Sequence, residues 1–180
     1  TSRVKKYEVA VPDFFKTYIN AIHENDLREA LINNTRRFRK LLKKIPRKKI
    51  DYAYAEGKWT IRELLQHIID SERVFVYRAL TFSRRDTVQL PGFDENAWAG
   101  TAKASQRKWR DLVNEFSALR AATELFFTSL NEEQLLQSGN ANNNLISVAG
   151  LGFVTAGHVA HHMRIIRERY LGKGEKKKKK

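Results

Sequence analysis

Two histidines in this sequence, His158 and His162, stand four residues apart in a segment with helical periodicity. That spacing places both rings on one helix face about one turn apart, where neutral imidazoles can bind one divalent ion. His67 lies among apolar residues of an earlier helical segment, near its inward face. A bundle that packs these helices together would supply three nitrogens to one metal. Three histidines leave a coordination position for water or substrate, which is typical of a catalytic metal.

The spacing alone leaves other interpretations open. Histidines four residues apart also occur as solvated or core side chains, and His67 alone fits a hydrogen-bonded interior histidine. His161 competes with His162 as the partner of His158, because residues three apart also share a helix face.

A metal held by three neutral histidines would activate bound water for hydrolysis near neutral pH. It would equally activate a thiol for attack on a small electrophile. Since the chain contains no cysteine, a low-molecular-weight thiol would have to enter as a cosubstrate. The metal could also be sequestered without turnover.

Further polar residues are candidates for the same site. Asp70 and Glu72 follow His67 and could orient an imidazole or act as a base, although a solvated face or a salt bridge with Arg73 is favoured for Glu72. His161 could donate to substrate, contact a ligand histidine or face water.

The loop 89–100 and the last helix add candidates for substrate binding. Asp94, Glu95 and Asn96 could line the mouth of the site, with a turn or helix cap as the alternative for Asp94. Arg164 could hold an anionic substrate or pair with an acidic neighbour.

The elements that would position these residues are helices. Apolar residues recur at spacings of three and four, and no segment of useful length alternates with period two. Thr60 and Glu63 fit a capping box at the start of the second long helix. The pattern predicts an all-α antiparallel four-helix bundle with an extra short N-terminal helix. The expected helices cover 13–23, 26–45, 60–83, 105–130 and 147–171, and the connection between the second and third long helices could cross over or form a lid.

The charge is unevenly distributed along the 180 residues. The net charge is +14, of which residues 1–50 carry +9, residues 51–172 zero and residues 173–180 +5. We expect one domain over 1–172 followed by a lysine-rich tail. The basic face of the first long helix and this tail suggest, as an alternative function, binding of nucleic acid or another polyanion.

Composition excludes several classes of protein. Without cysteine there is no disulfide scaffold, Cys-based zinc site, iron–sulfur cluster or cysteine nucleophile. No apolar run approaches the ~20 residues that span a bilayer, and the first residues lack the apolar stretch of a signal peptide. We therefore expect a cytoplasmic protein with a small-molecule substrate; a homodimer remains open.

Three segments carry a resemblance to a known family: GKWTIRELLQHIIDSERVFVYRAL at 57–80, LPGFDENAWAG at 90–100 and AGHVAHHMRIIRERYLG at 156–172. Together they resemble the DinB-like (DinB/YfiT) metal-binding superfamily. The resemblance implies an up-up-down-down bundle with a triad at His67, His158 and His162 that binds a divalent ion, often nickel or zinc. Family members include thiol S-transferases, an isomerase and hydrolases, so it implies a metal-dependent hydrolase or thiol S-transferase without choosing between them.

Overall fold

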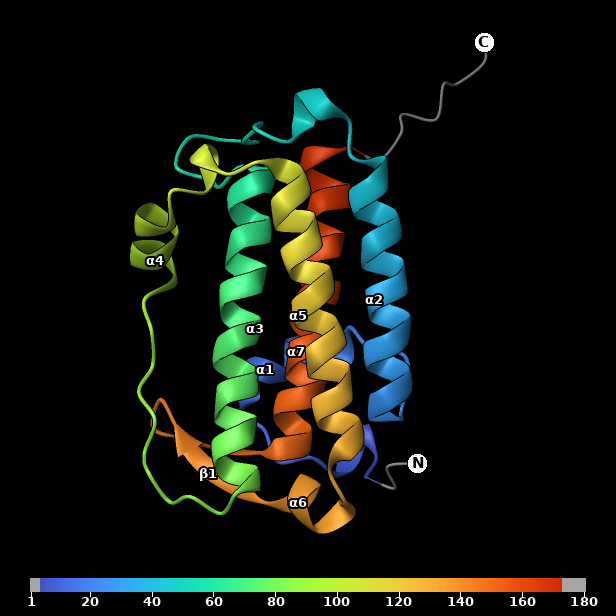
Figure 1. Ribbon diagram of the computed structural model, residues 1–180, viewed down its shortest axis with the longest axis vertical. Helices are drawn as coiled ribbons and strands as arrows, with labels where there is room; N and C mark the ends of the chain where they lie inside the picture. Colours follow the sequence, from blue (N-terminus) through green and yellow to red (C-terminus); the bar gives the residue numbers. More distant parts are fainter. Residues whose placement is uncertain (1–3, 173–180) are drawn as a thin grey trace.

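A four-helix bundle forms the body of the molecule in the computed structural model, which describes residues 4–172 (Figure 1). The prediction of an all-α four-helix bundle is confirmed. Within these residues, no helix is both long enough and apolar enough to cross a membrane. The lysine-rich segment 173–180 lies outside the described residues. The bundle helices are α2 (Leu27–Lys44), α3 (Ile61–Ser83), α5 (Trp109–Ser129) and α7 (Val148–Ile165).

The direction of the helices explains the long connections. In Figure 1, α2 and α7 run upward, whereas α3 and α5 run downward. Each of α7 and α5 packs against both α2 and α3. The order around the bundle is therefore up-up-down-down, as expected, while the order along the chain is up-down-down-up. Because α3 and α5 are parallel neighbours, residues 84–108 must cross back over the length of the bundle.

Shorter elements cover the ends and sides of the bundle. The crossover contains α4 (Glu95–Ala102), which packs against α3, and α1 (Asp13–Asn20) packs against α7. A β-hairpin lies at the lower end in Figure 1. The remaining elements are the 3-10 helices Lys6–Glu8, Arg47–Lys49 and Ala104–Gln106, helix α6 (Glu132–Leu136), strands β1 (Ser138–Ala141) and β2 (Asn144–Ser147), and a π-helical turn Ile166–Tyr170.

Local sequence signals define the helix starts. Thr60 accepts a hydrogen bond from the backbone of Glu63, whose side chain accepts one from the backbone of Thr60. This is the predicted capping box, which satisfies backbone donors that the first turn leaves free. Asp26 and Ser147 cap α2 and α7 by accepting hydrogen bonds from the backbone N–H groups of Glu29 and Gly150, without a reciprocal bond.

Two local features differ from the sequence expectations. The hairpin was not predicted, because its strands have four residues each, too few for a period-two pattern to show. Its turn has positive φ at Asn142 (50°) and Asn143 (60°), a conformation that asparagine tolerates. Leu80 is an apolar residue of the helical segment expected over 60–83, yet it is 40% exposed, whereas Ala79 and Phe82 are buried in the core.

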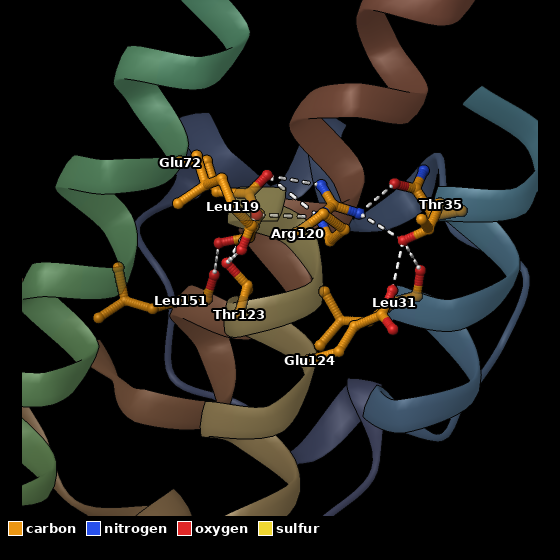
Figure 2. Close-up of polar contacts among 10 residues, drawn as sticks. Leu31, Thr35, Glu72, Leu119, Arg120, Thr123, Glu124 and Leu151 are labelled. Atoms are coloured by element: carbon orange, nitrogen blue, oxygen red, sulfur yellow. Dashed lines mark hydrogen bonds and ion pairs between the residues drawn. The ribbon is translucent and has the colours of Figure 1, made fainter. Parts of the chain in front are cut away.

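The hydrophobic core consists of two apolar clusters. A layer of polar side chains lies between them, and Figure 2 shows its contacts around Glu72 and Arg120. In each bundle helix, one end contributes residues to the first cluster and the other end to the second. A buried polar side chain lies between these two sets of residues. Glu72 and Arg120 form an ion pair in this layer, with their side chains 2% and 0% exposed. Asn34, Thr123 and His158 are among the other polar residues buried where the two clusters adjoin.

Candidate metal centre

Three buried histidines converge between α3 and α7. The Nε2 atom of His158 lies 3.0 Å from Nε2 of His67 and 3.0 Å from Nε2 of His162. One ligand atom from each ring lies within 4.8 Å of the other two. Two nitrogens bonded to one ion at about 2.0–2.1 Å are separated by roughly 3 Å, so the residues fit a shared metal ion. The spacing left this convergence open as one of several interpretations, and the family resemblance implied it.

The close packing of the three Nε2 atoms indicates a site for a metal ion. Each Nε2 of a neutral imidazole carries either one proton or one lone pair. The Nε2 of His158 therefore cannot form two good hydrogen bonds with its two neighbours at once. A metal ion at the centre would accept all three lone pairs. The donor set consists of neutral nitrogens, which suits zinc, nickel, cobalt or iron.

Aromatic side chains hold the histidine rings in place. The Trp59 ring centroid lies 4.6 Å from that of His67. Tyr18 from α1 and Phe75 from α3 pack edge-on against His158, with centroid distances of 5.4 Å and 5.6 Å. These contacts exclude water from the back of the rings and keep their Nε2 atoms directed at one point.

Burial keeps the three imidazoles neutral. It lowers the pKa of His67 to about 4, from an ordinary value of 6.5. The pKa values of His158 and His162 are also well below 6.5, chiefly because of burial and then because of neighbouring histidines. Each ring therefore offers a lone pair at neutral pH.

Close approach of α1 depends on Gly157, the residue before His158. A Cβ atom at position 157 would lie 2.2 Å from the backbone oxygen of Tyr18. The lack of a side chain at Gly157 thus lets α1 bring Tyr18 against the histidine cluster.

Two cavities reach the cluster, one at His158 and the other at His162. A cavity of about 150 Å³ is lined by His158, Tyr18 and Glu95, among others. A cavity of about 230 Å³ is lined by His162 and Asn96, together with Trp59 and Tyr170. The first turn of α4 thus contributes one side chain to each cavity.

The predicted loop residues have different places in this arrangement. Asn96 lines the cavity at His162, in keeping with the predicted role at the mouth of the site. Asp94 instead caps α4, accepting hydrogen bonds from the backbone of Asn96 and Ala97, both at 3.0 Å. Its carboxylate is committed to the helix start, which was the alternative interpretation. It supports the site by fixing the first turn of α4.

The remaining predicted residues lie around the cluster and supply none of its three nitrogens. Asp70 lines a separate cavity of about 790 Å³, where its carboxylate accepts a hydrogen bond from Gln66 at 2.9 Å. Burial is the main cause that raises its pKa. His161 is half-buried, with its ring 5.2 Å from that of Tyr18. Arg164 is exposed, and its Nη1 lies 3.7 Å from Oε2 of Glu168. This agrees with the alternative interpretation, in which Arg164 pairs with an acidic neighbour.

The expectation for Glu72 was wrong. Neither a solvated face nor a pair with Arg73 describes it, because its carboxylate is buried against Arg120 and also accepts a hydrogen bond from Thr123. Arg73 pairs with Glu115 instead. Arg120 lies 48 residues away in sequence, so only the packing of α5 against α3 could reveal the pair.

Sequence reasoning missed several residues at the site. The Oγ of Ser71 lies 3.5 Å from Nδ1 of His67 and can orient that ring. The signal was present, since a serine four residues after a histidine shares its helix face. Tyr18 and Trp59 also contact the cluster, but both stand among apolar residues in the sequence, so their spacing does not distinguish them from core residues.

Comparison with known proteins agrees with this geometry. The protein OB0413 of Oceanobacillus iheyensis, named as a candidate metal-dependent hydrolase, is 28% identical over 165 residues, covering 89% of this chain and 90% of that protein. The structure of YfiT from Bacillus subtilis, described as a probable metal-dependent hydrolase with an unusual four-helix bundle topology, matches with a TM-score of 0.61. That match covers 88% of this chain and 89% of YfiT at 18% identity, which shows a shared fold. A family model of the DinB superfamily matches residues 30–166, and the chain therefore belongs to the DinB superfamily.

Proposed function

We propose that this protein is a metal-dependent hydrolase of a small molecule, with one divalent ion held by the Nε2 atoms of His67, His158 and His162. The observation that carries the proposal is the convergence of three buried, neutral imidazoles on one point. The names given to OB0413 and YfiT support it. Zinc and nickel are the ions that we expect, because both bind imidazole nitrogen well.

When bound, such an ion acts as a Lewis acid and lowers the pKa of a water molecule that it coordinates. Three neutral ligands leave its positive charge uncompensated. The protein contributes a dry pocket around it, since all three histidines are buried and aromatic rings surround two of them.

Two further side chains would act on the substrate. The pKa of Tyr18 is raised by burial and then by the charge of Glu95, so the phenol keeps its proton and can donate a hydrogen bond to a substrate oxygen. The pKa of Glu95 is raised mainly by burial, which makes its carboxylate a better proton acceptor. Both line the cavity that reaches His158.

A thiol S-transferase is the alternative reaction at the same site. The chain has no cysteine, so the thiol would be a low-molecular-weight cosubstrate. The two reactions differ in their nucleophile and are separated by a simple assay: a hydrolase consumes esters or amides in buffer alone, whereas a transferase requires added thiol.

The test of the proposal begins with metal content. We expect about one ion per chain in the wild type by plasma mass spectrometry, and none in His158→Ala. His161→Ala is the matched control, because it removes a neighbouring ring that supplies none of the three converging nitrogens. Wild type that takes up no zinc or nickel on titration would refute the metal site. Turnover of an ester panel that survives complete metal removal would refute the metal-dependent reaction.

The exposed face of α2 favours a second candidate function, polyanion binding. A groove of about 530 Å³ is lined by Arg36, Arg39, Lys40 and Lys43. If this face binds nucleic acid, log affinity should fall linearly with log salt, and Lys40→Gln with Lys43→Gln should reduce the slope by about two. Loss of binding at physiological salt would exclude this function. Homodimer formation remains a prediction for a sizing measurement.

A further inference from the structure

A large cavity beside the histidine cluster has no role in the hydrolytic steps described above. It encloses about 790 Å³ between α3 and the crossover segment, within the range of about 300–1,000 Å³ that is usual for small-molecule sites. Arg78, Gly92 and Phe93 line both this cavity and the smaller one that reaches His158. Arg78 therefore borders both spaces.

Arg78 is a buried cation without an acidic partner. The residue is 5% exposed. Its Nη2 donates one hydrogen bond to the backbone oxygen of Pro91, at 2.8 Å. Within residues 4–172, no carboxylate oxygen lies within 4.0 Å of its guanidinium. Burial of an unpaired charge is costly, and burial lowers the pKa of Arg78 accordingly.

Other arginines that are buried or line this cavity have a carboxylate partner. Arg120 is equally buried and donates to the carboxylate of Glu72 through Nε and Nη2. Arg73 and Arg107, which line the same cavity as Arg78, both pair with Glu115. Arg78 is the one lining arginine of this cavity left without a carboxylate in the described part of the chain.

The carboxylates that line the two cavities do not fill that role. Asp70 lines the large cavity, where its Oδ1 accepts a hydrogen bond from Gln66. Glu95 lines the small cavity. Neither forms an ion pair with Arg78, so the guanidinium retains donors for a ligand.

We propose that Arg78 binds the carboxylate of a small apolar ligand whose body occupies the large cavity. A guanidinium presents paired donors that match a carboxylate. The cavity wall is largely apolar and aromatic, with contributions from Val74, Tyr77, Leu90, Phe93 and Trp98. An aryl-substituted or branched carboxylic acid combines these two properties.

This assignment deepens the proposed function and rests on it in one respect. If the protein is a hydrolase, the ligand is its substrate, anchored at Arg78 so that a scissile bond extends through the small cavity toward His158. Binding of the carboxylate itself needs no metal and no turnover. The two proposals can therefore fail separately.

The experiment compares an acid with its neutral amide. Naphthalene-1-acetate and naphthalene-1-acetamide have the same ring and differ in charge, and isothermal titration calorimetry measures the affinity of each. We expect wild type to prefer the acid by at least about tenfold. Arg78→Met should reduce the ratio to about one, and Arg78→Lys should retain part of it. Metal-free His158→Ala should keep the full preference, whatever its activity.

Arg73→Met is the matched control, because it removes a cation from the same cavity that already has a carboxylate partner. It should leave the preference unchanged. Equal affinity of wild type for acid and amide, absence of binding by both, or an unchanged preference in Arg78→Met would each overturn the proposal. Arg78→Met should unfold at the same or higher urea concentration than wild type, since it removes an unpaired buried charge. A marked loss of stability would show instead that the guanidinium serves mainly to hold Pro91.

Discussion

Replacement of Arg120 by methionine tests the polar layer of the core. Arg120 is fully buried, and its guanidinium donates to Glu72 from Nε at 2.9 Å and Nη2 at 2.8 Å and to Asn34 from Nη1 at 2.9 Å (Figure 2). Arg120→Met removes all three contacts. It leaves the carboxylate of Glu72, 2% exposed, with the hydroxyl of Thr123 at 2.7 Å as its remaining side-chain donor.

The expected cost is large relative to total stability. Removal of one partner from a buried ion pair costs about 3–5 kcal/mol, because an uncompensated charge stays in the core. The whole free energy of unfolding of a domain is about 5–15 kcal/mol. The double variant Glu72→Leu with Arg120→Met removes both charges and should be less destabilised than Arg120→Met alone.

Urea unfolding of metal-free protein, followed by circular dichroism at 222 nm, measures these differences. Arg164→Met is the control, since its exposed pair with Glu168 should contribute at most about 1 kcal/mol. If Arg120→Met lowers the free energy of unfolding by less than about 1 kcal/mol, with an unchanged urea m-value, the buried ion pair does not stabilise the fold as argued.

Three further predictions concern packing, metal binding and pH. Gly157→Ala should destabilise the protein by about 1–3 kcal/mol in urea unfolding, because its Cβ meets backbone, whereas Gly100→Ala in α4, with open space around it, should be neutral or stabilising. Ser71→Ala should weaken zinc binding about tenfold in competition with a chelator, because the Nδ1 of His67 loses its partner; unchanged affinity would exclude this role. The pKa of Tyr170 is raised to about 12, chiefly by burial, so the folded protein keeps this proton above pH 10, where the unfolded chain releases it. Stability should therefore fall as the pH rises from 10 to 12, and Tyr170→Phe should lose this dependence. In a titration followed by absorbance at 295 nm, the variant should lack one tyrosine that ionises near pH 12.

The sequence predicted features that depend on local chemistry. Helix starts at Asp26, Thr60 and Ser147 follow from side chains that cap the next turn. The shared face of His158 and His162 follows from helix geometry. The family resemblance supplied the partner from α3, which the bundle then placed at 3.0 Å.

Features that depend on packing between distant segments could not be predicted. The pairing of Glu72 with Arg120, and the lack of a carboxylate at Arg78, are set by which helices become neighbours. Both arginines lie in helices with many charged residues, so neither stands out by composition. Asp70 follows His67 by three residues, yet its side chain lines the large cavity and not the histidine cluster.

The parallel arrangement of α3 and α5 has a consequence for how this protein can change over evolution. It forces residues 84–108 to travel the length of the bundle, and residues 91–102 within them line all three cavities near the histidines. The three histidines, by contrast, all belong to α3 and α7. Insertions or replacements in the crossover can therefore reshape these cavities without disturbing the three converging histidines. Exchange of this segment between relatives that share the bundle would test whether it sets their specificity.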